Sequence, residues 1–350
     1  MTAAIKRNVA PEILRTFAAD LLTAGGFTAE QARQTSGLLV WANLRGAESH
    51  GVLRIPRYIE MVKLGIINSD AKPAFKTEMG AIAVLDADRA PGAVGMLLAA
   101  EKAIKLAGSH GIGWCSARNI THAGAIGYFA QKVAEAGMIG MVMTASKPLM
   151  IYFGSSAEGV STNPLAIAAP TADPDRPIVF DMSTSAAALG KIMAARDAGV
   201  AIPEGWGVDA SGAGTTDPKA VKSMLPMAGP KGAGLSLMIE IMSSVLIANP
   251  IISASLNGTD GAAFNGLVLA VDPVAFGDKA AFRQAVEELA QAIKGLPAAA
   301  EHEPVLLPGE RGFAEAAKRT QEGIPIASGT LANLVAVATK YSVPIPPSLR

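Results

Sequence analysis

Residues 111–144 read GIGWCSARNITHAGAIGYFAQKVAEAGMIGMVMT, and this stretch decides the class of fold. Gly111–Ala117 and Ile139–Thr144 are short apolar runs typical of buried strands. Gly124–Ala136 between them has the pattern of a helix, which Gly137 ends. Because strand and helix signals alternate here, the sequence predicts an α/β core.

The alternation continues on both sides of this stretch, and the two ends of the chain are helical. Thr28 and Gln31 have the spacing of a capping box before a helix over Ala29–Arg45, which would deliver a Ser49-His50 turn at its end. The ends therefore predict a mainly helical second region. The other expected strands are 81–86, 165–169, 178–182 and 267–271, and the other expected helices are 11–22, 91–107, 185–195, 232–248, 279–293, 313–321 and 331–341.

Composition restricts the classes of function. The chain has 350 residues, which suits two domains, and 30 Lys+Arg balance 30 Asp+Glu. This balance favours neither nucleic acid nor an anionic membrane as a partner. The most apolar long run, Gly234–Ile252, contains Glu240 at its middle, so we expect a buried helix and no membrane span.

The single cysteine, Cys115, excludes an intramolecular disulfide and favours a cytoplasmic location. It lies in an apolar strand-like run, so we expect a buried structural thiol. The N-terminal sequence MTAAIKRNVAPEIL lacks the apolar region of a signal peptide.

The segment Glu48–Tyr58, ESHGVLRIPRY, concentrates chemistry that the rest of the chain lacks. The chain has four histidines, and His50 follows Ser49 in this segment. An imidazole can transfer a proton near neutral pH, and a guanidinium such as that of Arg54 can hold a carboxylate in two-point contact. The segment therefore predicts acid/base chemistry on a small anionic substrate.

Five further polar clusters lie at predicted turns, and each is also explained by an ordinary cap or turn. His122 precedes a helix, where backbone N–H groups favour an anion. Thr162 belongs to a rigid Ser-Thr-Asn-Pro turn, and Phe180–Ser185 offers hydroxyls and amides at a helix start. The glycine-rich residues 228–234, with Lys231, open a long helix, and the Leu307–Arg311 turn precedes another helix.

Several common motifs are missing from the sequence. There is no CxxC or HExxH spacing, so no metal site is predicted. There is no GxSxG elbow, which argues against a hydrolase that uses Ser49 and His50. Neither a Walker A motif nor a Rossmann GxGxxG after a strand is present.

Taken together, these blocks resemble the type-2 malate/L-lactate dehydrogenase family of NAD(P)-dependent oxidoreductases. The resemblance spans nearly the whole chain in the same order. The similar blocks are ANLRGAESHGVLRIPRYIEMVKLGIIN (42–68), NITHAGAIGYFAQKVAEAGMIGMVMT (119–144), STNPLAIAAPT (161–171), FDMSTSAAALGKI (180–192), IPEGWGVDASGAGTTDP (202–218), LPMAGPKGAGL (225–235) and LLPGE (306–310).

The resemblance implies a non-Rossmann α/β fold with a mixed, largely antiparallel sheet. It implies an NAD- or NADP-binding domain over residues 76–294 and a helical, substrate-side domain from residues 1–75 with 295–350. It also implies a homodimer that acts on a small 2-hydroxy or 2-oxo acid such as malate or lactate. Which acid, and which of the two cofactors, stays open.

The resemblance also implies roles for individual residues. His50 would be the catalytic acid/base, with Ser49 orienting it and His122 as the second candidate. Arg54 and Thr162 would contact the substrate. The implied cofactor contacts are His122, Ala123, Gly124, Ala125, Ile126, Asp181, Met182, Ser183, Lys231, Gly232, Gly309 and Glu310.

The chain departs from the family pattern at several positions. Asn43 stands where Asp is common, Ile120-Thr121 replaces Ser-Asn, and Ala228 and Ala233 replace a glycine and an aromatic residue. Lys191 stands where the cyclic imino acid reductases of this family tend to have Asp, which favours an oxo acid. A cyclic imine reductase, and a nicotinamide-binding protein without turnover, remain alternatives.

Overall fold

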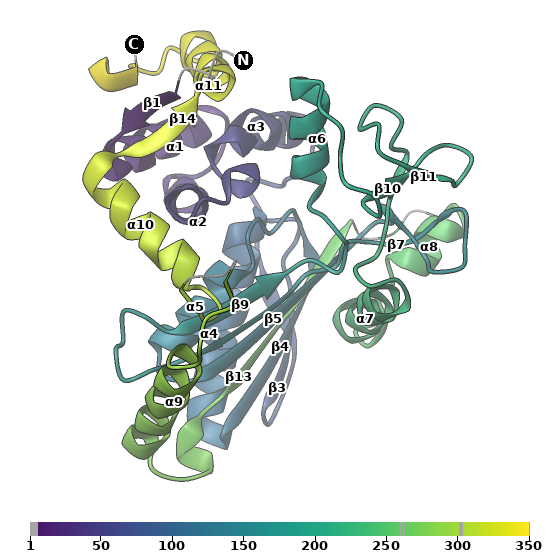
Figure 1. Ribbon diagram of the computed structural model, residues 1–350. Coiled ribbons are helices and arrows are strands. Elements are labelled where there is room, and N and C mark those ends of the chain that lie inside the picture. The colour runs from purple at the N-terminus through teal and green to yellow at the C-terminus, as the bar shows by residue number, and fades with distance from the viewer. Residues whose placement is uncertain (1–5, 260, 262, 301–303, 350) are drawn as a thin grey trace.

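The computed structural model describes residues 6–259, 261, 263–300 and 304–349 (Figure 1). In the part described, five of the six neighbouring strand pairs of the main sheet are antiparallel, and β3 and β4 form the parallel pair. The predicted mixed, largely antiparallel sheet is therefore confirmed. The seven strands follow the order β2 (Ala74–Met79), β3 (Ile82–Asp86), β4 (Ile112–Ile120), β13 (Phe264–Val271), β5 (Ile139–Ser146), β8 (Leu165–Ala169) and β9 (Ile178–Met182).

Helices α4 (Gly92–His110) and α5 (Gly127–Glu135) cover one face of this sheet (Figure 1). Small residues allow α4 to lie close to β4. A Cβ added to Gly113 would come within 2.0 Å of the Ala103 carbonyl oxygen, so only glycine fits there. Cys115 is fully buried between these elements, and burial raises its thiol pKa to about 12, so the thiol is inert.

Helix α7 (Pro230–Glu240) and the π-helix η3 (Ile241–Val245) lie on the other face, where Ile239 packs against Met143 and Leu267. Glu240 is buried as predicted, and its Oε1 accepts hydrogen bonds from the Ile251 and Ile252 N–H groups. The expectation of a wholly buried helix is wrong. One apolar side of it remains exposed, and its residues are Leu237, Met238, Ile241, Val245 and Leu246.

The two ends of the chain share a hydrophobic core above the sheet (Figure 1). Strand β1 (Lys6–Val9) pairs antiparallel with β14 (Ile324–Ala327), and the predicted capping box at Thr28 is present. This shared core supports the proposed division of the chain into a discontinuous helical domain and a central α/β domain. The helices of this part are α1 (Pro11–Ala24), α2 (Ala29–Leu44), α3 (Ile55–Lys63), α10 (Glu310–Glu322) and α11 (Ser328–Lys340).

A second, five-stranded sheet of very short strands lies beside α6 (Leu189–Ala198) and was not predicted. Strands of two or three residues carry no alternation that a sequence pattern can show. Its strands are β11 (Gly214–Thr215), β10 (Gly207–Val208), β12 (Ser223–Met224), β6 (Met150–Ile151) and β7 (Glu158–Val160). The remaining elements are α8 (Ile252–Leu256), α9 (Lys279–Lys294), η4 (Pro273–Ala275) and η5 (Pro347–Leu349).

Two predicted helices begin later than expected, and both delays affect the site. Gly124 has φ +75°, which is left-handed, so α5 begins only at Gly127. The residues from Ser185 to Ala188 are not helical, and Ala188 is extended, so α6 begins at Leu189. Both segments therefore run as irregular backbone beside the cavity described next.

Candidate active site

A cavity of about 540 Å³ brings together side chains that are far apart in the sequence, from Ala47 to Phe264. Its walls come from the turn after α2, the loop between β4 and α5, the turn before β8 and the end of β9. The predicted site residues that line it are Ser49, His50, Arg54, His122, Gly124, Ala125, Ile126, Thr162, Asp181, Met182 and Ser183.

His50 ends the first of two short 3₁₀ turns that follow α2, η1 (Glu48–His50) and η2 (Val52–Arg54). Asn43 anchors these turns, because its Oδ1 accepts a hydrogen bond of 2.8 Å from the Val52 N–H. A Cβ on Gly51 would come within 2.2 Å of that oxygen, so the turn requires glycine. Ser49 Oγ then lies 3.0 Å from His50 Nδ1.

His122 follows the end of β4 and lies against His50. The two imidazole rings are stacked, with their centroids 5.7 Å apart and their planes 16° from parallel. The hydroxyl of buried Tyr58, on α3, lies 2.7 Å from His122 Nδ1, and the Phe264 ring packs edge-on at 5.9 Å. Each histidine therefore has Nδ1 beside a hydroxyl, which restricts its ring orientation.

Both imidazoles are held neutral by their surroundings. Burial, together with the smaller effect of the nearby Arg54 charge, lowers the pKa of His50 to about 4 and that of His122 to about 3. Arg54 itself is fixed by a 2.7 Å hydrogen bond from its Nε to the Ser49 carbonyl oxygen. The cavity thus places a fixed cation beside two neutral proton acceptors.

Asp181, at the end of β9, faces the start of α5. Its Oδ2 accepts a 2.9 Å hydrogen bond from the Gly127 N–H, at a helix N-terminus that favours negative charge. A Cβ on Gly127 would come within 2.7 Å of this oxygen. Burial nevertheless raises the Asp181 pKa to about 6, so the carboxylate can exchange a proton near neutral pH.

The turn around Thr162 is rigid, as predicted from its proline. Asn163 is buried, donates from Nδ2 to the Ser236 carbonyl oxygen at 3.0 Å and accepts from the Ser146 N–H at 3.1 Å. These bonds tie the turn to α7 and β5. Thr162 is thereby held at the cavity wall.

Five predicted cofactor residues do not line this cavity. Ala123 is buried in the hydrophobic core of the main sheet. Gly232 lies against the Thr184 carbonyl oxygen, and Lys231 beside it is exposed. Gly309 packs on Val179, and Glu310 lines another cavity, of about 460 Å³.

Three basic side chains from the blocks that resemble the family also lie outside this cavity. Arg45 stacks on the Phe313 ring at 4.0 Å and donates to the Gly309 carbonyl oxygen. Arg57 forms an exposed ion pair with Glu60. Lys191 does not line the cavity and has its Nζ 5.9 Å from the centroid of the Trp206 ring.

The structure adds residues that the sequence pattern missed. Lys147 lines the cavity, but a single exposed lysine between two strands carries no sequence signal. Tyr58 belongs to the Glu48–Tyr58 segment, yet its separation of 64 residues from His122 hid their contact. Leu189 and Gly190, at the start of α6, complete the wall.

Within the described residues, no group of three or more His, Cys, Asp or Glu side chains is placed to hold a metal ion. Among the same residues, no helix is both long enough and apolar enough to cross a membrane.

Comparison with known proteins agrees over nearly the whole chain. A sequence model of the malate/L-lactate dehydrogenase family matches residues 9–335. The chain is 34% identical to an NAD(+) ureidoglycolate dehydrogenase of Escherichia coli K12 over 323 residues, covering 91% of this chain and 92% of that protein. It is 35% identical to a malate dehydrogenase of Pyrococcus horikoshii over 347 residues, covering 96% of each.

Solved structures agree with these relatives. The P. horikoshii malate dehydrogenase structure gives a TM-score of 0.88, with 98% of this chain and 99% of that chain covered. A delta1-piperideine-2-carboxylate reductase of Pseudomonas syringae gives a TM-score of 0.84 at 29% identity, with 95% of this chain and 100% of that chain covered.

Proposed function

The chain belongs to the malate/L-lactate dehydrogenase family, and from that premise we propose that it is an NAD(P)-dependent oxidoreductase. It would transfer hydride reversibly between nicotinamide and a small 2-hydroxy or 2-oxo acid. The observation that carries this proposal is the stacked pair of neutral histidines beside Arg54 in one cavity.

The cavity has the chemistry that a nicotinamide nucleotide requires. Backbone at Gly124–Ile126 and the Asp181 carboxylate offer polar contacts, while Phe264 and Leu149 offer apolar walls. We propose that these groups hold the nicotinamide and its ribose, and that Met182, Ser183, Lys231 and Gly309-Glu310 contact more distant parts. When bound, the nicotinamide supplies the hydride acceptor or donor.

We assign proton transfer to His50 and carboxylate binding to Arg54, with Thr162 as a further substrate contact. In the oxidation direction, neutral His50 accepts the proton of the substrate hydroxyl, and Ser49 keeps its ring oriented. In the reduction direction, the negative charge that develops on the carbonyl oxygen favours the protonated form of His50, which passes its proton to that oxygen. His122 is the second candidate for this role.

The proposal is tested by mixing the purified protein with NADH or NADPH and following reduced nicotinamide across a panel of 2-oxo acids. Oxidation with an oxo acid identifies the reaction and the preferred cofactor. We expect His50→Ala to lower turnover by roughly 10²- to 10⁴-fold. Unchanged turnover in that variant would exclude His50 as the proton-transfer residue.

A second candidate is reduction of cyclic imino acids, which the similarity to the P. syringae reductase favours. Lys191 argues against imine reduction, because the cyclic imino acid reductases of this family tend to have Asp at that position. Adding a cyclic imine such as piperideine-2-carboxylate to the panel separates the two. Cofactor binding without oxidation by any substrate would instead support a protein without turnover.

We also propose that the protein is a cytoplasmic homodimer. The exposed apolar side of α7 and η3 supports the second copy, because a soluble monomer rarely leaves so many neighbouring apolar side chains in water. The single buried cysteine supports a reducing compartment.

A further inference from the structure

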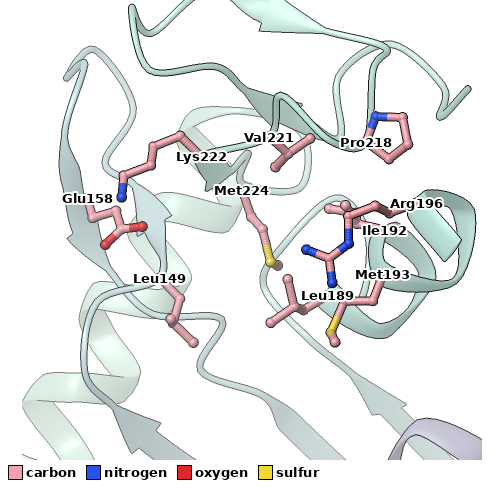
Figure 2. Close-up of a pocket in the computed structure, with 10 residues that line it drawn as sticks. All are labelled: Leu149, Glu158, Leu189, Ile192, Met193, Arg196, Pro218, Val221, Lys222 and Met224. Atoms are coloured by element: carbon pink, nitrogen blue, oxygen red, sulfur yellow. The ribbon is translucent and has the colours of Figure 1, made fainter.

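A second cavity, of about 230 Å³ (Figure 2), shares two of its lining residues with the catalytic one. It opens between α6 and the five-stranded sheet. Leu149 and Leu189 line both cavities, so these two side chains form their common wall. No sequence pattern indicated this space, because its walls come from four separate parts of the chain.

The lining of the second cavity is apolar with charged groups at its edges. Met224 and Ile192 are buried and form its floor. Figure 2 shows the Lys222 side chain extending towards Glu158, whose Oε1 also accepts a hydrogen bond of 3.0 Å from Ser223. The Arg196 guanidinium lies apart from that pair, beside Leu189, Met193 and Met224 (Figure 2).

Helix α6 connects the two cavities. It begins against the catalytic residues, since a Cβ on Gly190 would come within 2.8 Å of the Ser49 Cβ. Leu189, Met193 and Arg196 follow each other along one face of the helix, because residues three and four apart are neighbours. Side chains on a helix lean towards its N-terminus, so Arg196 is directed back towards Leu189.

The length of this face sets the size of ligand that would use both cavities. Leu189 and Arg196 are separated by about 10 Å along the helix axis at 1.5 Å per residue. The backward lean of the arginine shortens the distance to its guanidinium. A chain of several methylene groups would therefore reach from the catalytic cavity to Arg196.

We propose that the second cavity is a subsite for the far end of the substrate, and that the substrate is a 2-oxo acid whose apolar chain ends in a carboxylate. This inference rests on the proposed function and narrows its substrate class. Arg54 holds the reacting end, the apolar wall of Leu149 and Leu189 covers the chain, and Arg196 binds the terminal anion. A guanidinium suits this role because it can contact a carboxylate at two points.

The test compares 2-oxosuberate with 2-oxooctanoate, which has the same chain length but ends in a methyl group, and uses pyruvate as the short control. The wild-type protein should show a higher kcat/KM for 2-oxosuberate than for 2-oxooctanoate. Arg196→Gln should lower kcat/KM for 2-oxosuberate about tenfold, the effect of one partly exposed charged contact. Its values for 2-oxooctanoate and pyruvate should not change.

Lys219→Gln is the matched control. Lys219 lies in the same loop as Lys222 but does not line the cavity. Its substitution removes one positive charge, as Arg196→Gln does. It should leave all three substrates unaffected. Arg196→Glu is the second variant, and it should discriminate against 2-oxosuberate more strongly than Arg196→Gln while the melting temperature confirms a folded protein.

Titration calorimetry separates this inference from the proposed function. With oxidised nicotinamide present, 2-oxosuberate should bind more tightly than 2-oxooctanoate, and Arg196→Gln should abolish the difference even if no turnover occurs. Equal affinity for the two acids in the wild-type protein, or an unchanged preference in both Arg196 variants, overturns the subsite. Turnover of pyruvate in that case would leave the proposed function intact.

Discussion

At the scale of single residues, the site depends on two hydroxyl–imidazole contacts of different origin. Ser49 and His50 are neighbours in sequence, so an orienting role for Ser49 was accessible to sequence reasoning. Tyr58 and His122 come from different elements, and only folding brings them to 2.7 Å. Burial holds Tyr58 protonated by raising its pKa, so its hydroxyl can donate to His122 Nδ1.

Removing this hydroxyl should affect catalysis more than folding. In Tyr58→Phe the His122 ring loses the partner of its Nδ1, and we expect kcat to fall about 3- to 10-fold, the effect of one hydrogen bond. The KM for the cofactor should also rise, because the His122 ring would no longer be held in its orientation. A variant with a lower melting temperature but an unchanged cofactor KM would show a purely structural role for Tyr58.

The two histidines can be distinguished by comparing His50→Asn with His122→Asn. We expect the first variant to lose the pH dependence of kcat, since it removes the proposed proton-transfer group. The second should retain that dependence and change KM for the cofactor, because His122 packs against both His50 and Phe264 at the proposed nicotinamide site. Measuring kcat and cofactor KM across pH decides the assignment, and the opposite pattern would give the proton transfer to His122.

At the scale of elements, the turn that opens α7 contains a residue with a strained backbone. Ala228 has φ +48°, a left-handed conformation that disfavours any side chain, at a position where the resemblance led us to expect glycine. The next residue, Gly229, also has positive φ. A Cβ added to Gly232 would come within 2.5 Å of the Met227 and Thr184 carbonyl oxygens, so that position requires glycine. The turn therefore keeps its shape although one residue in it is strained.

Ala228→Gly should raise the free energy of unfolding by about 1 kcal/mol by removing this strain. The matched control is Ala233→Gly, the same chemical change inside α7, which should lower it by at least about 1 kcal/mol because the helical conformation favours alanine. Urea unfolding of both variants measures the two effects. Equal destabilisation by both would show that Ala228 is not strained.

The elements also show which parts of the fold a sequence pattern can predict. The strands Leu165–Ala169 and Ile178–Met182 have the predicted bounds because each is an apolar run between turn residues. The predicted starts of α5 and α6 were wrong. The left-handed Gly124 and the extended Ala188 break the helical backbone, but the apolar periodicity of the sequence does not show these breaks. For the site, the polar clusters were predictable, but their distances across the cavity depend on the sheet.

At the scale of the whole molecule, the buried ionisable groups couple stability to pH. The pKa values of His50 and His122 are about 4 and 3 in the folded protein, below the ordinary value of 6.5. Their contribution to the free energy of unfolding is complete above about pH 6.5. It is lost as the pH falls towards 4, because the unfolded chain then binds more protons than the folded protein. Asp181 acts in the opposite sense, since its pKa is raised from 3.8 to about 6 and its contribution is lost as the pH rises through 6.

Two variants should therefore change the pH dependence of the free energy of unfolding below about pH 6.5 in opposite directions. The double variant His50→Asn, His122→Asn should flatten the loss of stability between about pH 6.5 and 4, whereas Asp181→Asn should steepen it. Urea unfolding at several pH values in that window measures both slopes. Identical slopes in the wild-type protein and both variants would show that these three groups do not control the acid transition.

The quaternary structure gives the last prediction, which concerns the exposed side of α7 and η3. Met238 is 51% exposed and Leu246 is 64% exposed, and their apolar neighbours continue the same surface. Covering it with a second copy would remove this surface from water, so we expect a dimer in sedimentation velocity, and Leu246→Glu should shift it to monomer because a buried carboxylate without a partner is costly. Leu64→Glu is the control, since Leu64 is 62% exposed at the end of α3 and should leave the dimer intact. A monomeric wild-type protein, or a dimer that Leu246→Glu does not weaken, would place the subunit contact elsewhere or remove it.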